Sequence, residues 1–139
     1  MWTVRQQIRD QIKSTIAANV PALEGRVTGV RTFARGKDRL PDCEVVTLSE
    51  ERERLSEDDA QRSMHTVAVA LYDSVDAAGT VQDRLDAIAQ DVITALDADA
   101  TLDAICDGFQ SVDYEFDMPE GGAEQPASLT ITCVAMTLA

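Results

Sequence analysis

An apolar residue recurs at every fourth position near the start of the chain. These residues are Val4, Ile8, Ile12, Ile16 and Val20, and Ala17 lies beside them. Such a spacing gathers the apolar side chains on one face of an α-helix. Pro21 has no backbone N–H to continue the helical hydrogen bonds. The pattern therefore predicts an amphipathic helix over residues 4–20.

The next stretches are typical of strands. Residues 26–33 are rich in β-branched side chains, residues 34–39 form a polar turn, and residues 43–48 predict a second strand. A third strand is predicted over residues 64–72. One of its faces carries His65, Val67, Val69 and Leu71, and the other is only weakly apolar. We therefore expect one side of this strand to pack inward and the other to be partly exposed.

A second helix is predicted to follow Gly79, with Thr80 as its N-cap and Asp83 in its first turn. Its apolar face would consist of Val81, Leu85, Ile88, Ala89, Val92 and Leu96. A short helical piece is expected over residues 101–107. Gly108 would end that piece, since glycine commonly terminates helices.

The C-terminal part of the chain predicts an antiparallel hairpin of residues 111–118 and 127–137. In its first strand Val112, Tyr114, Phe116 and Met118 alternate with Ser111, Asp113, Glu115 and Asp117, which gives an acidic outer face. The element order is therefore α-β-β-β-α-(α)-β-β. It predicts one α+β domain over residues 1–139, a two-layer sandwich in which two main helices cover one face of a mostly antiparallel sheet of about five strands.

Residues 49–62 are the most polar part of the chain. They hold six acidic and three basic residues, with Leu55 as the one apolar anchor. Such a composition is typical of a mobile charged loop, or of an extended hairpin arm. Long segments of this kind often serve as contact surfaces.

The charge distribution narrows the classes of partner. The chain has a net charge of −13, which disfavours binding to free nucleic acid or to an anionic membrane surface. No apolar run reaches the length of a membrane span, and we expect no signal peptide. Residues 1–40 hold eight basic and three acidic residues, whereas residues 41–139 hold four basic and 22 acidic ones. This asymmetry indicates neighbours of complementary sign, unless the charges mix over the folded surface.

The sequence predicts no catalytic, cofactor or metal site. His65 is the sole histidine, and its place on an apolar strand face favours a structural role. The three cysteines (Cys43, Cys106 and Cys133) are widely spaced and are expected to be buried thiols in a cytosolic protein. Residues 97–103 look like half of a calcium loop, but Leu102 replaces the required glycine. We expect these aspartates to cap a helix junction.

A local motif adds to the element order. Leu40-Pro41 introduces the second strand, which runs into the acidic stretch Leu48-Ser49-Glu50-Glu51. Together they resemble the tail terminator (minor tail protein U-like) family of long-tailed bacteriophages and gene transfer agents, over nearly the whole chain. The chain departs from that family in Asp42-Cys43-Glu44, which is more polar than the usual run. Residues 49–62 are also longer and more charged than the resemblance implies.

The resemblance implies a structural virion protein rather than an enzyme, with no cofactor. Such a protein forms a hexameric ring on the last ring of the tail tube, stops tube polymerisation and provides the head-tail joining surface. Its partners would be its own copies, the tail tube protein and a head-completion or neck protein. DNA would pass through the ring without specific binding. The protein would reside in the host cytoplasm during assembly and then at the head-proximal end of the tail.

Two groups of residues are candidates for contacts in such a ring. The first pairs Arg31, Arg35, Lys37 and Arg39 with Glu50, Glu51, Glu53, Glu57, Asp58 and Asp59 across subunits or against the tail. The second is an acidic lumen lined by Asp113, Glu115 and Asp117, which would repel DNA phosphates. A plain solvated strand face is the alternative for these three residues. A head-tail completion protein, a small ligand-binding regulatory domain and an enzyme that uses carboxylates alone stay open as alternative functions.

Overall fold

The structure is a computed structural model that describes residues 3–29, 39–55, 61–76, 78–119 and 125–138. Along the chain the elements are α1 (Val4–Asn19), the 3-10 helix η1 (Pro21–Leu23), β1 (Val27–Thr28), β2 (Asp42–Arg54), β3 (Gln61–Asp73), α2 (Val81–Asp97), α3 (Ala100–Ile105), β4 (Gly108–Asp117) and β5 (Ala127–Leu138). This order agrees with the predicted one.

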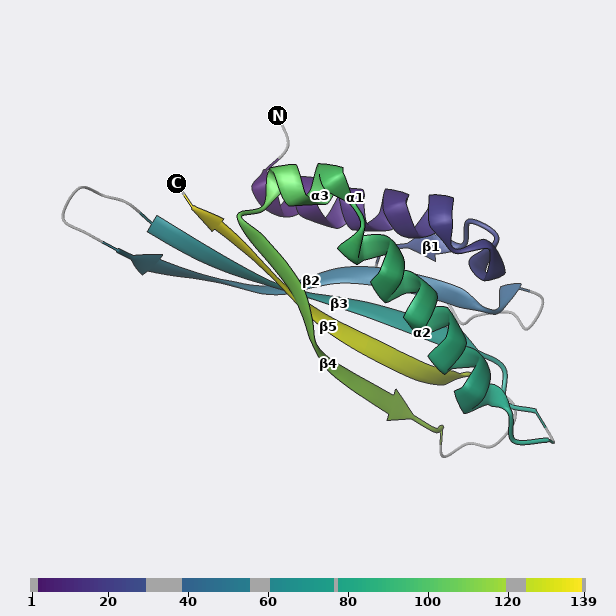
Figure 1. Cartoon of the computed structure of the whole chain (residues 1–139). Helices are drawn as coiled ribbons and strands as arrows, with labels where there is room; N and C mark the ends of the chain where they lie inside the picture. Colours follow the sequence, from purple (N-terminus) through teal and green to yellow (C-terminus); the bar gives the residue numbers. More distant parts are fainter. Residues whose placement is uncertain (1–2, 30–38, 56–60, 77, 120–124, 139) are drawn as a thin grey trace.

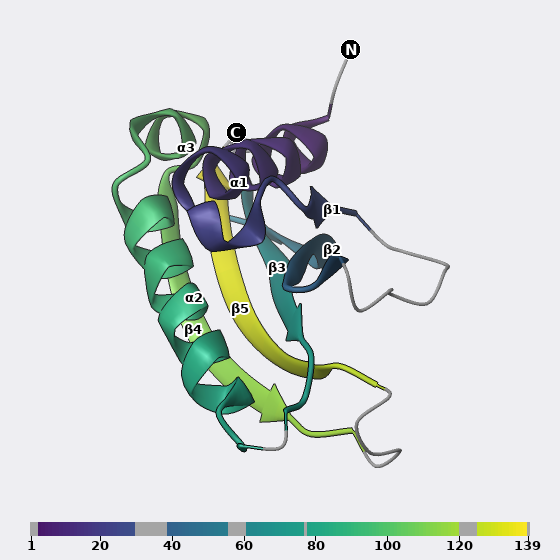
Figure 2. The same ribbon diagram turned by 90° about the vertical axis from the view of Figure 1, so that its right-hand side faces the viewer.

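One five-stranded sheet forms the first layer, in the order β1-β2-β3-β5-β4. The short β1 is parallel to β2, and every other pair is antiparallel. Helix α1 packs against β1 and β2, and α2 packs against β3, β5 and β4, so both helices cover the same face (Figures 1 and 2). The expected two-layer α+β fold is therefore confirmed.

Helix α1 begins with a capping box in which Thr3 and Gln6 exchange side-chain-to-backbone hydrogen bonds. Ile8, Ile12 and Ile16 are fully buried, but Val4 is 44% exposed. The predicted stripe is wrong at Val4 because a step of four residues exceeds one helical turn by about 40°. The stripe therefore rotates away from the sheet, and Thr15 takes an inward position in place of Ala17.

Helix α2 buries all six residues of its predicted apolar face. Its N-cap is Thr80, but the hydroxyl of Thr80 makes no capping bond and donates to Asp76 instead. In α3 the N-cap is Asp99, whose carboxylate accepts from the backbone N–H groups of Thr101 and Leu102. An aspartate therefore caps this helix junction, as expected.

The predicted helix stop at Gly108 is wrong. Helix α3 already ends at Ile105, because its C-cap Cys106 has extended backbone angles (φ −107°, ψ 150°). Gly108 is instead the first residue of β4 and pairs with Met136 of β5. The turn out of the helix is thus made without a left-handed glycine.

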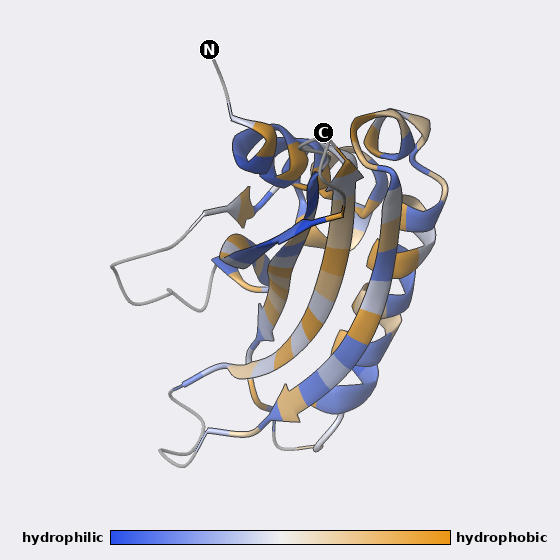
Figure 3. Ribbon diagram, turned by 90° about the vertical axis from the view of Figure 1, so that its left-hand side faces the viewer, coloured by the Kyte–Doolittle hydropathy of each residue, from blue (hydrophilic) through white to orange (hydrophobic). Residues whose placement is uncertain are grey.

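The predicted apolar face of the first C-terminal strand is also partly wrong. A register shift between Ser111 and Asp113 leaves Val112 as a bulge, 49% exposed. Met118 follows the end of β4 and is 47% exposed. Phe116 keeps its inward place, and Phe109 joins it against the core. Figure 3 shows the resulting bands of hydrophobic and hydrophilic residues along β4 and β5.

Strands β2 and β3 are longer than expected. Residues 49–54 continue β2, and residues 61–63 are added at the start of β3, while residues 56–60 lie outside the described residues. We call Glu51–Arg54 together with Gln61–Met64 the hairpin arm, and Figure 1 shows it running out past the N-terminal end of α1. The strand predicted over residues 26–33 is seen at Val27–Thr28, and the prediction is wrong at Arg26 and Gly29, which lie outside β1. Residues 30–33 of that prediction, and residues 34–38 of the predicted turn, lie outside the described residues.

The core between the two layers contains all three cysteines, and none of them forms a disulfide. Burial raises the pKa of the Cys106 thiol to about 11 and that of Cys133 to about 12. Both thiols are therefore protonated at neutral pH and behave as small apolar side chains. The expectation of buried thiols is confirmed.

Candidate functional site

No described element covers the second face of the sheet. Register places Asp113, Glu115 and Asp117 of β4 opposite Thr132, Thr130 and Ser128 of β5. These β5 residues point away from Leu129, Ile131 and Cys133, which are buried under the helices. The three carboxylates are all exposed, so they form an acidic row on the uncovered face at the β4 edge.

A second acidic row lies on the same face. Glu44, Glu51 and Glu53 of β2 pair in register with Ala70, Met64 and Arg62 of β3. Between the two rows, β3 and β5 carry uncharged residues, most of them small: Thr66, Ala68, Ala70, Tyr72, Ser128, Thr130, Thr132 and Val134. The uncovered face therefore has two acidic borders about a neutral centre. On this face Glu53 forms an ion pair with Arg62.

The structure separates the acidic residues that the sequence grouped together. Glu51 and Glu53 lie on the uncovered face, whereas Glu50 points to the helix side. Arg39 is exposed just before the cis peptide bond Leu40–Pro41. The other members of the proposed pairing lie outside the described residues; these are Arg31, Arg35, Lys37, Glu57, Asp58 and Asp59.

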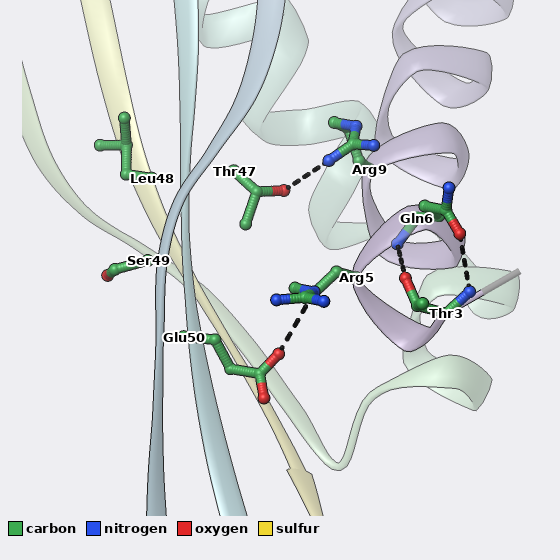
Figure 4. Close-up of a pocket in the computed structure, with 8 residues that line it drawn as sticks. All are labelled: Thr3, Arg5, Gln6, Arg9, Thr47, Leu48, Ser49 and Glu50. Atoms are coloured by element: carbon green, nitrogen blue, oxygen red, sulfur yellow. Dashed lines mark hydrogen bonds and ion pairs between the residues drawn. The ribbon is translucent and has the colours of Figure 1, made fainter.

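Sequence reasoning missed a cleft of about 400 Å³ between the start of α1 and β2. Figure 4 shows Arg5 and Arg9 reaching from α1 toward β2. Arg9 donates from Nη1 to the hydroxyl of Thr47 at 3.2 Å, and Arg5 Nε lies 3.6 Å from Oε1 of Glu50. Polar side chains from the first turns of α1 therefore form one wall of the cleft, and residues 47–50 of β2 form the other.

A bulge in β2 explains why Thr47 and Glu50 share a side. The register with β3 shifts between Thr47 and Ser49, so Leu48 is an extra residue. In Figure 4 Thr47 and Glu50 point toward α1, while Leu48 and Ser49 lie on the far side of the strand. Without the extra residue, strict alternation would turn Glu50 to the uncovered face.

His65 of β3 lies beside Glu50, next to the cleft between α1 and β2. Its side chain is 2% exposed and lines a neighbouring cleft of about 300 Å³. Nε2 lies 3.1 Å from the hydroxyl of Thr137 on β5, and Nδ1 lies 3.5 Å from Oε1 of Glu50. The Nδ1 atom is buried and has no hydrogen-bond partner among the described residues. The predicted inward orientation of His65 is confirmed.

The charges around His65 shift two pKa values. A hydrogen bond from Arg52 (2.5 Å) is the main cause that lowers the pKa of Glu50, against an opposing effect of burial. Burial is the main cause that lowers the pKa of His65; Glu50 opposes this shift, and Arg5 and Arg52 add to it. Glu50 is therefore ionised and His65 neutral at pH 7.

A hydroxyl, an imidazole and a carboxylate in this order are reminiscent of a catalytic triad, but the geometry differs from what nucleophilic catalysis requires. The carboxylate of Glu50 is held by two arginines, and 3.5 Å is too long for the bond that orients the base. A lowered pKa also makes His65 a weak base. The arrangement therefore supports a structural role for His65.

Within the described ranges, no three His, Cys, Asp or Glu residues lie close enough together to hold a metal ion. In the same ranges, no helix is both long and apolar enough to cross a membrane. No protein-family model matches the chain, and no curated protein matches it. Its function is therefore inferred from its own fold and surfaces.

Proposed function

We propose that this protein is a structural subunit of a phage-like tail, which closes into a ring on the end of the tail tube. There it stops tube polymerisation and offers the joining surface for the head. Its partners are its own copies, the tail tube protein and a head-completion or neck protein. Assembly takes place in the host cytoplasm and ends at the head-proximal end of the tail. The observation that supports this function best is the uncovered face of the sheet with its two acidic rows.

An acidic face suits the wall of a channel through which DNA passes. Carboxylates repel phosphates, and at physiological salt this repulsion acts over about 8 Å. The uncharged residues between the rows offer no cation that would retain the DNA backbone. Two copies packed face to face would bring acidic rows together, so this face also disfavours a simple dimer. A lumen lined by Asp113, Glu115 and Asp117 would therefore repel DNA rather than retain it.

Closure of a ring needs two different surfaces on each subunit. At one end of the sheet, α1 packs on β1 and β2 and carries Arg5, Arg9 and Lys13. At the other end, β4 carries the acidic row. Arg5 and Lys13 are paired with Glu50 and Asp10 of the same copy, so the α1 end is of mixed charge whereas the β4 edge is acidic. The two ends of the sheet thus differ, which is compatible with a head-to-tail contact between copies.

The test is the mass of the purified protein in solution, measured by light scattering over a range of protein and salt concentrations. A mass of six times 15.1 kDa, with rings visible by electron microscopy, is the expected result. Because the contact is between charged surfaces, the assembly should weaken as salt rises. A protein that stays monomeric in every condition, and that leaves the growth of tail tubes unchanged, would contradict the proposal.

The same preparation distinguishes the alternatives. Binding to isolated tail tubes supports the terminator, whereas binding to DNA-filled heads alone would indicate a neck protein. A small regulatory domain would instead remain monomeric and be stabilised against heat by a metabolite. The cleft between α1 and β2 is the place where such a ligand would be sought first.

A further inference from the structure

We infer that His65 is a protonation-sensitive clamp at the base of the hairpin arm, and that mild acidification releases the arm while the body of the domain stays folded. This inference concerns the conformation of the free chain. It therefore does not depend on the proposed ring. Release of the arm would change the surface that the protein presents to any partner.

The position of His65 makes it a junction of three strands. It lies opposite Glu50 of β2 and opposite Ala135 of β5 in the sheet registers. Its ring reaches Thr137 through Nε2 and faces Glu50 through Nδ1. The arm begins at the next residues, Glu51 on one strand and Met64 on the other. Residues 62–64 of the arm also pair with residues 136–138 of β5, so the imidazole adds a side-chain contact between β2, β3 and β5 at the base of the arm.

Charged groups face the imidazole from two elements. Glu50 and Arg52 approach from β2, and Arg5 approaches from α1; the contact from β5 is the uncharged hydroxyl of Thr137. One carboxylate thus already has two guanidinium partners. A protonated His65 would add a third positive charge around Glu50 in a site where the ring is 2% exposed. Burial and both arginines oppose that charge, and Glu50 alone favours it.

The direction of the pH effect follows from linkage. With the arm closed, the pKa of His65 is lowered from its ordinary value of 6.5, and with the arm open the ring returns to that value. Below pH 6.5 the open form therefore binds more protons, and the closed form loses stability as the pH falls. Glu50, whose pKa is also lowered, adds a further loss only below its ordinary value of 4.5.

The arm is expected to open before the body because none of its side chains belongs to the buried core, and sheet pairing with β2 and β5 is what holds it. Residues 51–55 are exposed, and the pair of Glu53 with Arg62 lies on the surface. The body is held by Val67, Val69 and Leu71 of the same strand, which are fully buried. Segments with few buried apolar contacts open locally at a lower free energy than the core.

The experiment uses the full chain and two readouts from nuclear magnetic resonance. His65 is the only histidine, so its imidazole signal titrates without overlap. Amide hydrogen exchange is then measured at pH 7.0 and 5.5 and expressed as protection factors, which correct for the intrinsic exchange rate. Amides of residues 51–54 and 61–64 should lose protection by up to about tenfold at the lower pH, the limit set by one proton. Amides of residues 67–71 should keep theirs.

Two variants complete the test. His65→Gln keeps a polar side chain that cannot be protonated, so the arm should show the same protection at both pH values. Glu53→Gln removes an exposed charge of the arm and should leave the pH effect intact. A titration of His65 at or above 6.5 would overturn the inference, even if His65→Gln failed to fold. Equal loss of protection in the body, or a pH effect that persists in His65→Gln, would also overturn it.

Discussion

The guanidinium Nε of Arg84 on α2 lies 3.0 Å from the carboxylate of Asp73 at the end of β3. The side chain of Asp73 is 8% exposed, and Arg84 is the only Lys or Arg after residue 62. Nη1 of Arg84 also lies 2.7 Å from Asp76, and Nη2 donates to the carbonyl of Ser74. One side chain therefore joins the third strand, the following loop and the second helix.

Replacement of this arginine should destabilise the fold. Arg84→Met leaves the buried carboxylate of Asp73 without a cation, a change that costs 3–5 kcal/mol in fully buried pairs. Arg84 is 38% exposed, so we expect a smaller loss of about 1–3 kcal/mol in the free energy of unfolding. Urea denaturation measures it. Lys13→Met, which breaks the surface pair with Asp10, is the control and should cost less than about 0.5 kcal/mol. Equal losses in the two variants would contradict this interpretation.

Asp76 provides a prediction about pKa. The hydroxyl and the backbone N–H of Thr80 both donate to its carboxylate, and with Arg84 they lower its pKa from 3.8 to about 2. Its contribution to stability is therefore present above pH 3.8 and is lost as the pH falls toward 2. Thr80→Val removes the hydroxyl and should raise the pKa of Asp76 toward 3.8. Carbon-13 titration of the carboxyl group checks this, with Thr101→Val as the control. An unchanged pKa in Thr80→Val would show that the hydroxyl does not matter.

Asp99 is expected to be the most important cap. Burial raises its pKa, but hydrogen bonds from Thr15, Gln11 and the α3 backbone outweigh burial, so that its pKa is lowered. Asp99→Ala removes a cap worth about 0.5–2 kcal/mol and leaves the buried hydroxyl of Thr15 without its acceptor. We expect a loss of about 2–3 kcal/mol in thermal or urea unfolding. Asp103→Ala, an exposed change in the same helix, should cost less than about 1 kcal/mol. A ranking in the opposite order would contradict this assignment.

The sequence predicted burial correctly in elements that pack against one layer through a single regular face. In α2 a single face meets the sheet, so the six apolar residues predicted for that face are all buried. In β4, alternation alone predicted Val112 as an inward residue, but a bulge shifts the register there. A bulge adds one residue to one strand, and nothing in the local pattern marks it. The same limit applies to Leu48, which is 60% exposed.

The cleft and the clamp could not be predicted because their members are far apart in the chain. Arg5, Glu50 and His65 meet only after α1, β2 and β3 have packed together. The arm was equally ambiguous in the sequence, since both of its faces are polar and show no alternation. The acidic row of β4 was visible, because Asp113, Glu115 and Asp117 alternate with apolar residues. Only the fold, however, shows that no described element covers the face on which this row lies.

The last prediction concerns this uncovered face. If the acidic rows line a channel, reversal of charge inside it should make DNA adhere. In the double variant Asp113→Lys with Glu115→Lys, assembled rings should bind duplex DNA at low salt, and the affinity should fall steeply as salt rises. Wild-type rings should show no binding. The control is Asp83→Lys with Asp86→Lys, which changes the net charge equally at exposed positions of α2. Because these residues lie on the helical layer, control rings should behave as wild type. Equal DNA binding by both variants would mean that net charge alone matters, and the acidic rows would then have no role as the wall of a channel.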